Sequence, residues 1–216
     1  MNIKKSSLLL LSLILLSFIA TCLVYPKLPA EVAIHFNFEG IADNFAGKWI
    51  VFVLALLPLF FLGLFFIIPK LDPRQEAYQK HHQVYTIVIF STTLLFIIIH
   101  WITLFIALGV AIPVEHIMPI LVGILFIIIG NFLPRVRSNY TLGIRTPWAL
   151  EDANNWKKTQ RAGGYCFILA GSLIILESLF LRPLTFLFWL SLVIAIVVPY
   201  MTSYLDYRKK HVSYKK

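Results

Sequence analysis

Charged residues are scarce in this chain, and acidic residues are the scarcest of them. Only 13% of the 216 residues are charged, and ten Asp and Glu stand against nineteen Lys and Arg. Apolar residues make up 59% of the sequence. A soluble domain of this length carries more charge on its surface, so this composition excludes an ordinary soluble protein and indicates an integral membrane protein.

Cysteines and catalytic motifs are also few. Cys22 and Cys166 fall in or beside different apolar runs near opposite membrane faces, so we expect no disulfide and predict that both are buried small apolar residues. There is no Ser placed near a plausible His and acid, no H-E-x-x-H, no glycine-rich phosphate loop and no cluster of carboxylates within the apolar runs. We therefore expect no enzyme activity, no cofactor and no metal.

The apolar residues are gathered in long runs. Each run holds roughly 20 residues, which is the length that a helix needs to cross a bilayer. The runs are continuously apolar and do not alternate, so helices are predicted and a barrel is excluded. The expected fold is an all-α integral membrane protein with six transmembrane helices, near residues 6–25, 50–69, 85–109, 114–133, 165–181 and 184–203.

Basic residues are unevenly shared between the segments that join these spans. Sixteen Lys and Arg lie on one set of alternate segments, and only Lys27, Lys48 and Arg182 lie on the other. The positive-inside rule then places both termini in the cytoplasm and one structured loop, 26–49, outside. This topology accounts for the net charge of +9, so we expect no direct nucleic-acid binding. The basic tail is expected to contact membrane lipids.

The chain is accordingly divided into two membrane domains. Residues 1–70 hold spans one and two with the extracellular loop 26–49. Residues 71–216 hold spans three to six with the cytoplasmic loop 134–162 and the tail.

The outer loop has an alternating pattern. Apolar residues occupy every second position from Val32 to Phe38, which predicts a short strand, and Gly40 with Asp43-Asn44 is expected to turn the chain back. His35, Asn37 and Asp43 form either a polar network that orders the loop or, less favourably, a zinc site.

Three polar residues fall within the spans. An ionisable group in hydrocarbon is costly, so each needs a partner. We expect His100 to form a hydrogen bond to another helix, Glu177 to reach outward towards Arg182, and Asn131 to hold the following loop.

The segment from Gly130 to Gly164 is the most distinctive part of the sequence. We expect a positive φ at Gly143 and a helix start at Thr146-Pro147. Trp148 and Trp156 lie either on one interfacial helix or on two helices, the second capped by Asp152 and running into span five. Six basic residues lie in this segment: Arg135, Arg137, Arg145, Lys157, Lys158 and Arg161.

Arg145 has two interpretations. It is a lipid-phosphate anchor, or it is a planar fork that binds backbone carbonyls or a partner's carboxylate. We favour the fork, because the other basic residues of the segment already supply charge for lipid.

This segment follows the pattern G-N-x-L-P-x-x-x-x-N-x-x-x-G-I-R-T-P-W, then W-x-x-T-x-R-x-x-G. It resembles the hallmark of the SdpI-type immunity proteins of bacteria. The outer loop, L-P-x-x-x-x-x-H-F-N-x-x-G-x-x-D-x-x-x-x-K, is similar to a small domain that often precedes this hallmark. The chain departs from the pattern at Gln160 and at Asn154-Asn155.

The resemblance implies a multi-pass protein of the bacterial plasma membrane that protects the cell from a secreted, membrane-active peptide toxin. It also implies signalling by an ArsR-like repressor held at the membrane. The alternative is a transporter of a small or lipidic substrate. The toxin-facing residues would be His35, Asn37, Gly40 and Asp43, and the cytoplasmic recognition loop would hold Asn131, Pro134, Asn139, Gly143, Arg145, Thr146, Pro147, Trp148, Trp156, Thr159 and Arg161.

The predicted topology can be tested by thiol labelling. A cysteine at Asn44 should react with an impermeant reagent in intact cells, whereas a cysteine at Asn154 should react only after the cells are opened. Labelling of both positions in intact cells, or of Asn154 alone, would overturn the expected orientation.

Overall fold

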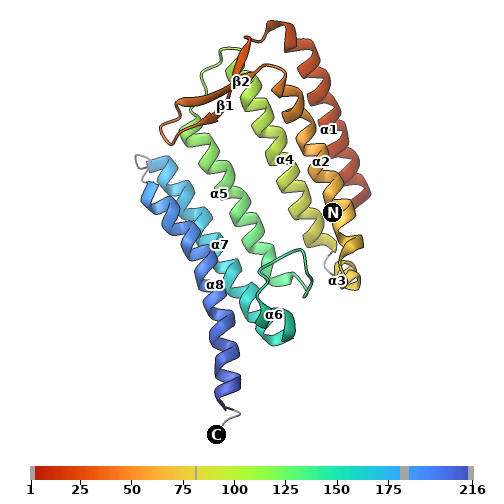
Figure 1. Ribbon diagram of the computed structural model, residues 1–216, viewed down its shortest axis with the longest axis vertical. Coiled ribbons are helices and arrows are strands. Elements are labelled where there is room, and N and C mark those ends of the chain that lie inside the picture. The colour runs from red at the N-terminus through yellow and green to blue at the C-terminus, as the bar shows by residue number, and fades with distance from the viewer. Residues whose placement is uncertain (1–2, 81, 181–184, 214–216) are drawn as a thin grey trace. The chain divides into compact units, whose positions relative to one another are not determined.

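The computed structural model describes residues 3–80, 82–180 and 185–213. Within these residues, six helices are long and apolar enough to cross a membrane, as the sequence predicts. The predicted ends at Leu181 and Leu184 lie outside the described residues. The helices are α1 (Ile3–Val24), α2 (Ile50–Leu71), α3 (Gln75–Lys80), α4 (His82–Ala107), α5 (Val114–Phe132), α6 (Pro147–Glu151), α7 (Ala153–Phe180) and α8 (Thr185–Ser213), with strands β1 (Glu31–Phe36) and β2 (Ala42–Gly47) (Figure 1).

Helix α7 begins well before the predicted span at residue 165. Asp152 starts it, because its Oδ1 accepts hydrogen bonds from the backbone N–H groups of Asn154 and Asn155 at 2.7 and 3.2 Å. Trp148 therefore lies on the short helix α6 and Trp156 on α7, which confirms the interpretation with two helices. The first turns of α7 are polar and project beyond its apolar part.

The chain forms two compact units. One consists of residues 1–66 and 86–121, and the other of residues 67–85 and 122–216. We refer to them as unit 1 and unit 2. The proposed division at residue 70 stays a prediction.

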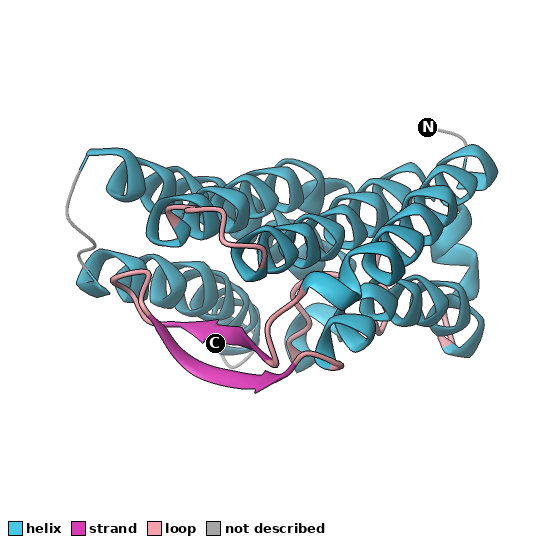
Figure 2. Cartoon of the chain, turned by 90° about the horizontal axis from the view of Figure 1, so that it is seen from above, coloured by secondary structure: helices cyan, strands magenta, loops and turns pink. Residues whose placement is uncertain are grey.

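Unit 1 carries the loop between α1 and α2 as an antiparallel hairpin (Figure 2). Val32 of β1 is buried together with Leu28, Val51 of α2 and Leu104 of α4. The tight packing of this cluster attaches the hairpin to the ends of the helices.

The predicted strand and the turn at Gly40 are confirmed, but Asp43-Asn44 takes no part in the turn. The Oδ1 of Asn37 accepts from the N–H groups of Glu39 and Ile41 at 3.0 and 2.9 Å, and Gly40 has a φ of 74°. The turn is therefore made by residues 37–41, and Asp43-Asn44 lies in β2. The side chain of Asn37 replaces the backbone partners that a tighter turn would supply.

His100 of unit 1 is buried and has the partner that the sequence requires. Its Nε2 lies 2.9 Å from the Oγ1 of Thr21 on α1. The neighbouring Trp101 donates from its Nε1 to the Oγ of Ser17, one turn earlier on α1, at 2.9 Å. These bonds join α4 to α1 inside an apolar surrounding, where polar groups have few other partners.

One prediction about a single residue is wrong. Cys22 is exposed on the surface of α1, although Cys166 is buried as expected. The cause is that an apolar run does not reveal which of its faces points away from the protein. Glu177 is buried. Because Arg182, its suggested partner, lies outside the described residues, the expected contact between the two side chains stays a prediction.

Two pairs of glycines join α5 and α7 in unit 2. A Cβ added to Gly130 would lie 2.7 Å from the carbonyl oxygen of Gly164, and one added to Gly171 would lie 2.5 Å from that of Gly123. Within each helix the two glycines are seven residues apart, so the pairs lie on one side of each helix. Small residues allow membrane helices to pack with their backbones in direct contact.

We predict that Gly130→Ala and Gly171→Ala each destabilise unit 2. The new methyl group would meet backbone, which cannot move aside as a side chain does, so the two helices would separate at a cost of about 1–3 kcal/mol. The measurement is the unfolding temperature of the purified protein in detergent. Gly63→Ala is the matched control, because nothing lies within 4 Å of its added Cβ. Equal unfolding temperatures for all three variants would contradict close packing.

Candidate functional site

Asp72, directly after α2, organises the loop that follows α5. Its Oδ2 accepts hydrogen bonds from the hydroxyl of Tyr78 at 3.0 Å, the N–H of Tyr140 at 2.9 Å and the hydroxyl of Thr141 at 3.2 Å. Its Oδ1 accepts from the N–H of Arg74 at 2.8 Å. One buried carboxylate thus joins the chain after α2 to the loop after α5.

The hydrogen bonds of Asp72 determine its charge. Burial by itself would raise the pKa of the carboxyl, but the donors from Arg74, Tyr140, Tyr78 and Thr141 together lower the pKa below its ordinary value. Burial and the bond to Asp72 raise the pKa of Tyr78, so its hydroxyl stays a donor. The site holds a carboxylate that is ionised at neutral pH.

Asn139 shapes the loop from within. Its Oδ1 accepts from the N–H groups of Thr141 and Leu142 at 2.9 and 2.6 Å. Its Nδ2 donates to the carbonyls of Arg137 and Leu142 at 2.7 and 3.0 Å. The amide has two donors and two acceptor positions, and this buried side chain uses all of them on backbone.

Gln160 holds the other end of the loop. The N–H of Ile144 donates to its Oε1 at 3.0 Å, and its Nε2 donates to the carbonyl of Ile144 at 2.7 Å. Gly143 has a φ of 100°, and a Cβ there would lie 2.7 Å from the Oε1 of Gln160. The expected positive φ is confirmed, and contact with Gln160 is a second reason for glycine at this position.

Thr146, Asn155 and Ser203 connect α6, α7 and α8. Thr146 caps α6, because its Oγ1 accepts from the N–H of Ala149 at 3.0 Å and it also bonds Ser203. The Nδ2 of Asn155 donates to the carbonyl of Ser203 at 2.8 Å, and the hydroxyls of Ser203 and Thr159 donate to its Oδ1 at 2.6 and 3.1 Å. All of these side chains are buried.

The two tryptophans have different roles. Trp156 is buried, and its Nε1 donates to the carbonyl of Val136 at 2.8 Å. Trp148 is partly exposed and packs against a face of α8, where its ring centre lies 5.1–5.9 Å from those of Tyr200, Tyr204 and Tyr207. Figure 1 shows α7 and α8 side by side beyond this point.

Arg145 is exposed at the rim of this cluster. Its Nη1 donates to the carbonyl of Tyr140, so one arm of the guanidinium orders the loop. No other hydrogen bond or ion pair of this side chain is found among the described residues, although its charge acts on the hydroxyl of Tyr78, and part of the fork is exposed. The geometry accommodates the interpretation as a fork but does not test it.

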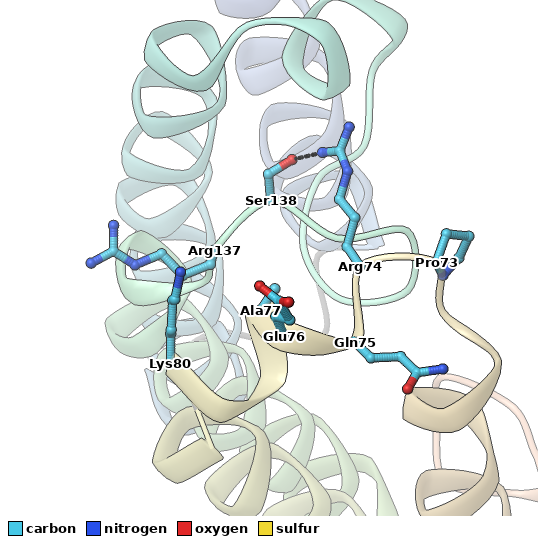
Figure 3. A pocket seen from close by; sticks show the side chains of 8 residues that line it. All are labelled: Pro73, Arg74, Gln75, Glu76, Ala77, Lys80, Arg137 and Ser138. Atoms are coloured by element: carbon cyan, nitrogen blue, oxygen red, sulfur yellow. Dashed lines mark hydrogen bonds between the residues drawn. The ribbon is translucent and has the colours of Figure 1, made fainter.

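An open pocket of about 810 Å³ lies beside the cluster in unit 2. Arg74 is held at one end by a bond to the hydroxyl of Ser138 (Figure 3). It also donates to the carbonyl of Leu150, and Tyr140 stacks on its guanidinium. Three cations and one carboxylate line the pocket, which favours an anionic ligand. The lining residues are Pro73, Arg74, Gln75, Glu76, Ala77, Lys80, Arg137 and Ser138.

The structure brings most of the inner motif together. Asn131 and Arg161 are exposed and lie outside the hydrogen-bonded cluster, and Pro134 packs close to Gly164. The cluster itself contains Asn139, Gly143, Thr146, Trp156 and Thr159, with Pro147 as the first residue of α6.

Of the four residues predicted to face the toxin, only two contact each other. His35 and Asp43 pair across the hairpin at 2.6 Å, whereas Asn37 forms the turn and Gly40 faces Glu115. Within the described residues, no group of three His, Cys, Asp or Glu side chains could hold a metal ion.

Asp72, Asn155, Gln160 and Ser203 are absent from the sequence-based list of site residues, although they connect the cluster. Asp72 has a local signal: an Asp before Pro at the end of an apolar run is typical of a cap or turn. Asn155 and Gln160 stand out only as departures from the family pattern. For Ser203 we find no local signal.

The fold and the cluster define a multi-pass helical membrane protein with an ordered polar loop. Residues 135–203 match the SdpI/YfhL protein family, and residues 12–62 match a domain of unknown function, DUF1648. The chain is similar to the immunity protein SdpI of Bacillus subtilis (strain 168), with 26% identity over 95% of this chain and 97% of that protein. No solved structure matches it.

The resemblance that the motifs indicate is thereby confirmed: residues 135–203 match the SdpI/YfhL family model, and nearly the whole chain is similar to an immunity protein of that type. The similarity supports a membrane immunity protein. It is a similarity to an immunity protein family and not to an enzyme family, and it does not favour the transporter alternative.

We predict that Asp72→Asn loosens the loop at residues 136–146. The amide keeps the acceptor for Arg74 but places an NH2 group against the donors of Tyr140 and Tyr78, at a cost of about 1–3 kcal/mol. Hydrogen exchange of the loop in the purified protein should increase. Glu76→Gln is the matched control, because it removes an equal charge from an exposed position nearby.

Lowering the pH should also increase hydrogen exchange of the loop at residues 136–146 in the parent protein. The pKa of Asp72 is lowered by folding, so its stabilising contribution is complete above the ordinary carboxyl pKa, about 4, and is lost as the pH falls through the lowered value. Loop exchange in Asp72→Asn should not have this acid dependence. Identical pH profiles of parent and variant would remove Asp72 from its organising role.

Proposed function

We propose that this chain is an immunity protein of the bacterial plasma membrane that protects its cell from a secreted, membrane-active peptide. The observation that carries this proposal is the similarity to the immunity protein SdpI along nearly the whole chain. The six membrane-crossing helices are consistent with it, because protection from such a peptide takes place at the membrane.

The hairpin of unit 1 is the proposed contact surface for the peptide. Ile41 is 58% exposed and Phe45 is 53% exposed, and Ile34 and Trp49 are exposed beside them. A membrane-active peptide is amphipathic, and exposed apolar side chains offer a matching surface. Asn37, through its turn, and the exposed pair His35–Asp43 would keep the hairpin in shape.

The loop cluster of unit 2 is the proposed site for a cytoplasmic partner. Arg145 and the pocket around Arg74 present cations that the cluster holds in place, and these would pair with carboxylates on a soluble protein. A repressor bound there would be kept away from DNA. Coupling of the two sites would require two arrangements of the protein that both partners distinguish.

The test is survival of a sensitive strain that expresses the chain and is challenged with the killing peptide. Removing the apolar surface with Ile41→Ser and Phe45→Ser should lower the tolerated peptide concentration by about tenfold, the equivalent of about 1.4 kcal/mol of lost binding. Asn37→Ala should also lower protection, because it removes the acceptor that holds the turn.

Val110→Ser is the matched control, since Val110 is an exposed apolar residue of unit 1 outside the hairpin. Membrane abundance by immunoblot must be equal in all strains. If the parent chain gives no protection against any peptide of this class, the proposed function is wrong. If the parent protects and the hairpin variants protect equally well, the peptide binds to another part of the protein.

A further inference from the structure

A second pocket of unit 2, about 290 Å³ in volume, lies where α7 begins and α8 ends. It is small, and its wall is formed mainly by the apolar stems of charged side chains. Four of its five lining residues are cations. The lining residues are Asn154, Lys157, Lys158 and Arg161 of α7 and Lys210 of α8.

Two carboxylates neutralise only part of this charge. Lys158 pairs with Asp206, and Lys210 pairs with Asp152 and lies 3.6 Å from Asp206. These pairs fix two cations at the wall of the pocket. The bond from Lys210 lowers the pKa of Asp152, so this carboxylate stays ionised.

Lys157 and Arg161 are left to bind a ligand. They are one helical turn apart on α7, and both are exposed. None of the ion pairs found within residues 3–80, 82–180 and 185–213 includes either side chain. An ammonium and a guanidinium at this spacing suit a phosphate, which accepts hydrogen bonds on several oxygens.

The exposed face of α7 indicates where the pocket lies along the membrane normal. The face continues from Arg161 to Tyr165, which is 70% exposed, and then to Leu169 and Leu176, which are 50% and 51% exposed. Exposed apolar side chains on a membrane helix face acyl chains, and tyrosine is frequent at the boundary with water. With that face against the acyl chains, the pocket would lie near the level of the lipid phosphates.

We propose that this pocket binds the phosphate of an anionic phospholipid headgroup, with Lys157 and Arg161 as its principal ligands. A free phosphate offers the same chemistry, but the apolar face that begins at Tyr165 also provides for the acyl chains. The net positive charge of the pocket disfavours a zwitterionic lipid, whose ammonium group would approach Lys158 and Lys210.

The opposite side of the same turns of α7 faces the loop cluster, so a bound lipid would affect the stability of that cluster. Asn155, Thr159 and Gln160 alternate with the pocket residues along α7 and point into the loop cluster. A lipid bound at the pocket would stabilise these turns of α7. Gln160, which holds the loop through its bonds to Ile144, lies on them. This inference does not depend on the proposed function.

The experiment is a thermal-stability titration of the purified full chain in detergent. Phosphatidylglycerol and phosphatidylcholine are added in parallel, and glycerol phosphate and inorganic phosphate serve as the soluble arms. Phosphatidylglycerol alone should raise the unfolding temperature of the parent. Stabilisation by the soluble phosphates at equal concentration, or by both lipids equally, would overturn the proposal.

Variants test whether the preference for phosphatidylglycerol depends on Lys157 and Arg161. The double change Lys157→Gln and Arg161→Gln should weaken the preference for phosphatidylglycerol by about tenfold or more. The exchange Lys157→Arg with Arg161→Lys keeps both charges and should retain the preference, with helix content checked by circular dichroism.

Arg208→Gln with Lys209→Gln is the matched control, because it removes the same charge from exposed positions on neighbouring α8. It should leave the preference unchanged. An equal loss in the control would mean that the lipid responds to the overall basic charge, and this would overturn a defined pocket.

Discussion

Hydrogen bonding of backbone by buried side chains is the constraint on which the loop of unit 2 depends. An irregular segment among apolar helices has no neighbouring strand to satisfy its N–H and C=O groups, and leaving them unpaired is costly. Asp72, Asn139 and Gln160 supply the missing partners from three directions. The exposed parts of the site, Arg145 and the pocket around Arg74, are positioned because this frame is rigid.

The spacing of the second half of the motif follows from the two faces of α7. Trp156 and Thr159 point inward, to Val136 and Asn155, whereas Arg161 points outward with Lys157. One helix thus carries a structural face and a basic face along the same turns. The glycine pairs further along α7 serve the same purpose in the apolar part, where close backbone contact replaces hydrogen bonds.

Unit 1 has a different arrangement, in which an apolar cluster holds the hairpin in place. Val32 anchors the hairpin, while Ile41 and Phe45 remain exposed. Within the helices of this unit, His100 and Thr21 form a polar contact between α4 and α1. The hairpin is thus anchored on its buried side and carries exposed apolar side chains.

The sequence by itself determined the class, the six helices, the strand after Glu31, the cap at Thr146 and the positive φ at Gly143. These features depend on local physics: run length, alternation and the conformational freedom of single residues. Only the tertiary structure decided that Asp72 and Ser203 meet the motif, that Cys22 is exposed and Glu177 buried, and that the hairpin turns at residues 37–41. These features depend on which faces of distant segments meet, and a continuous apolar run carries no periodic signal of its buried side.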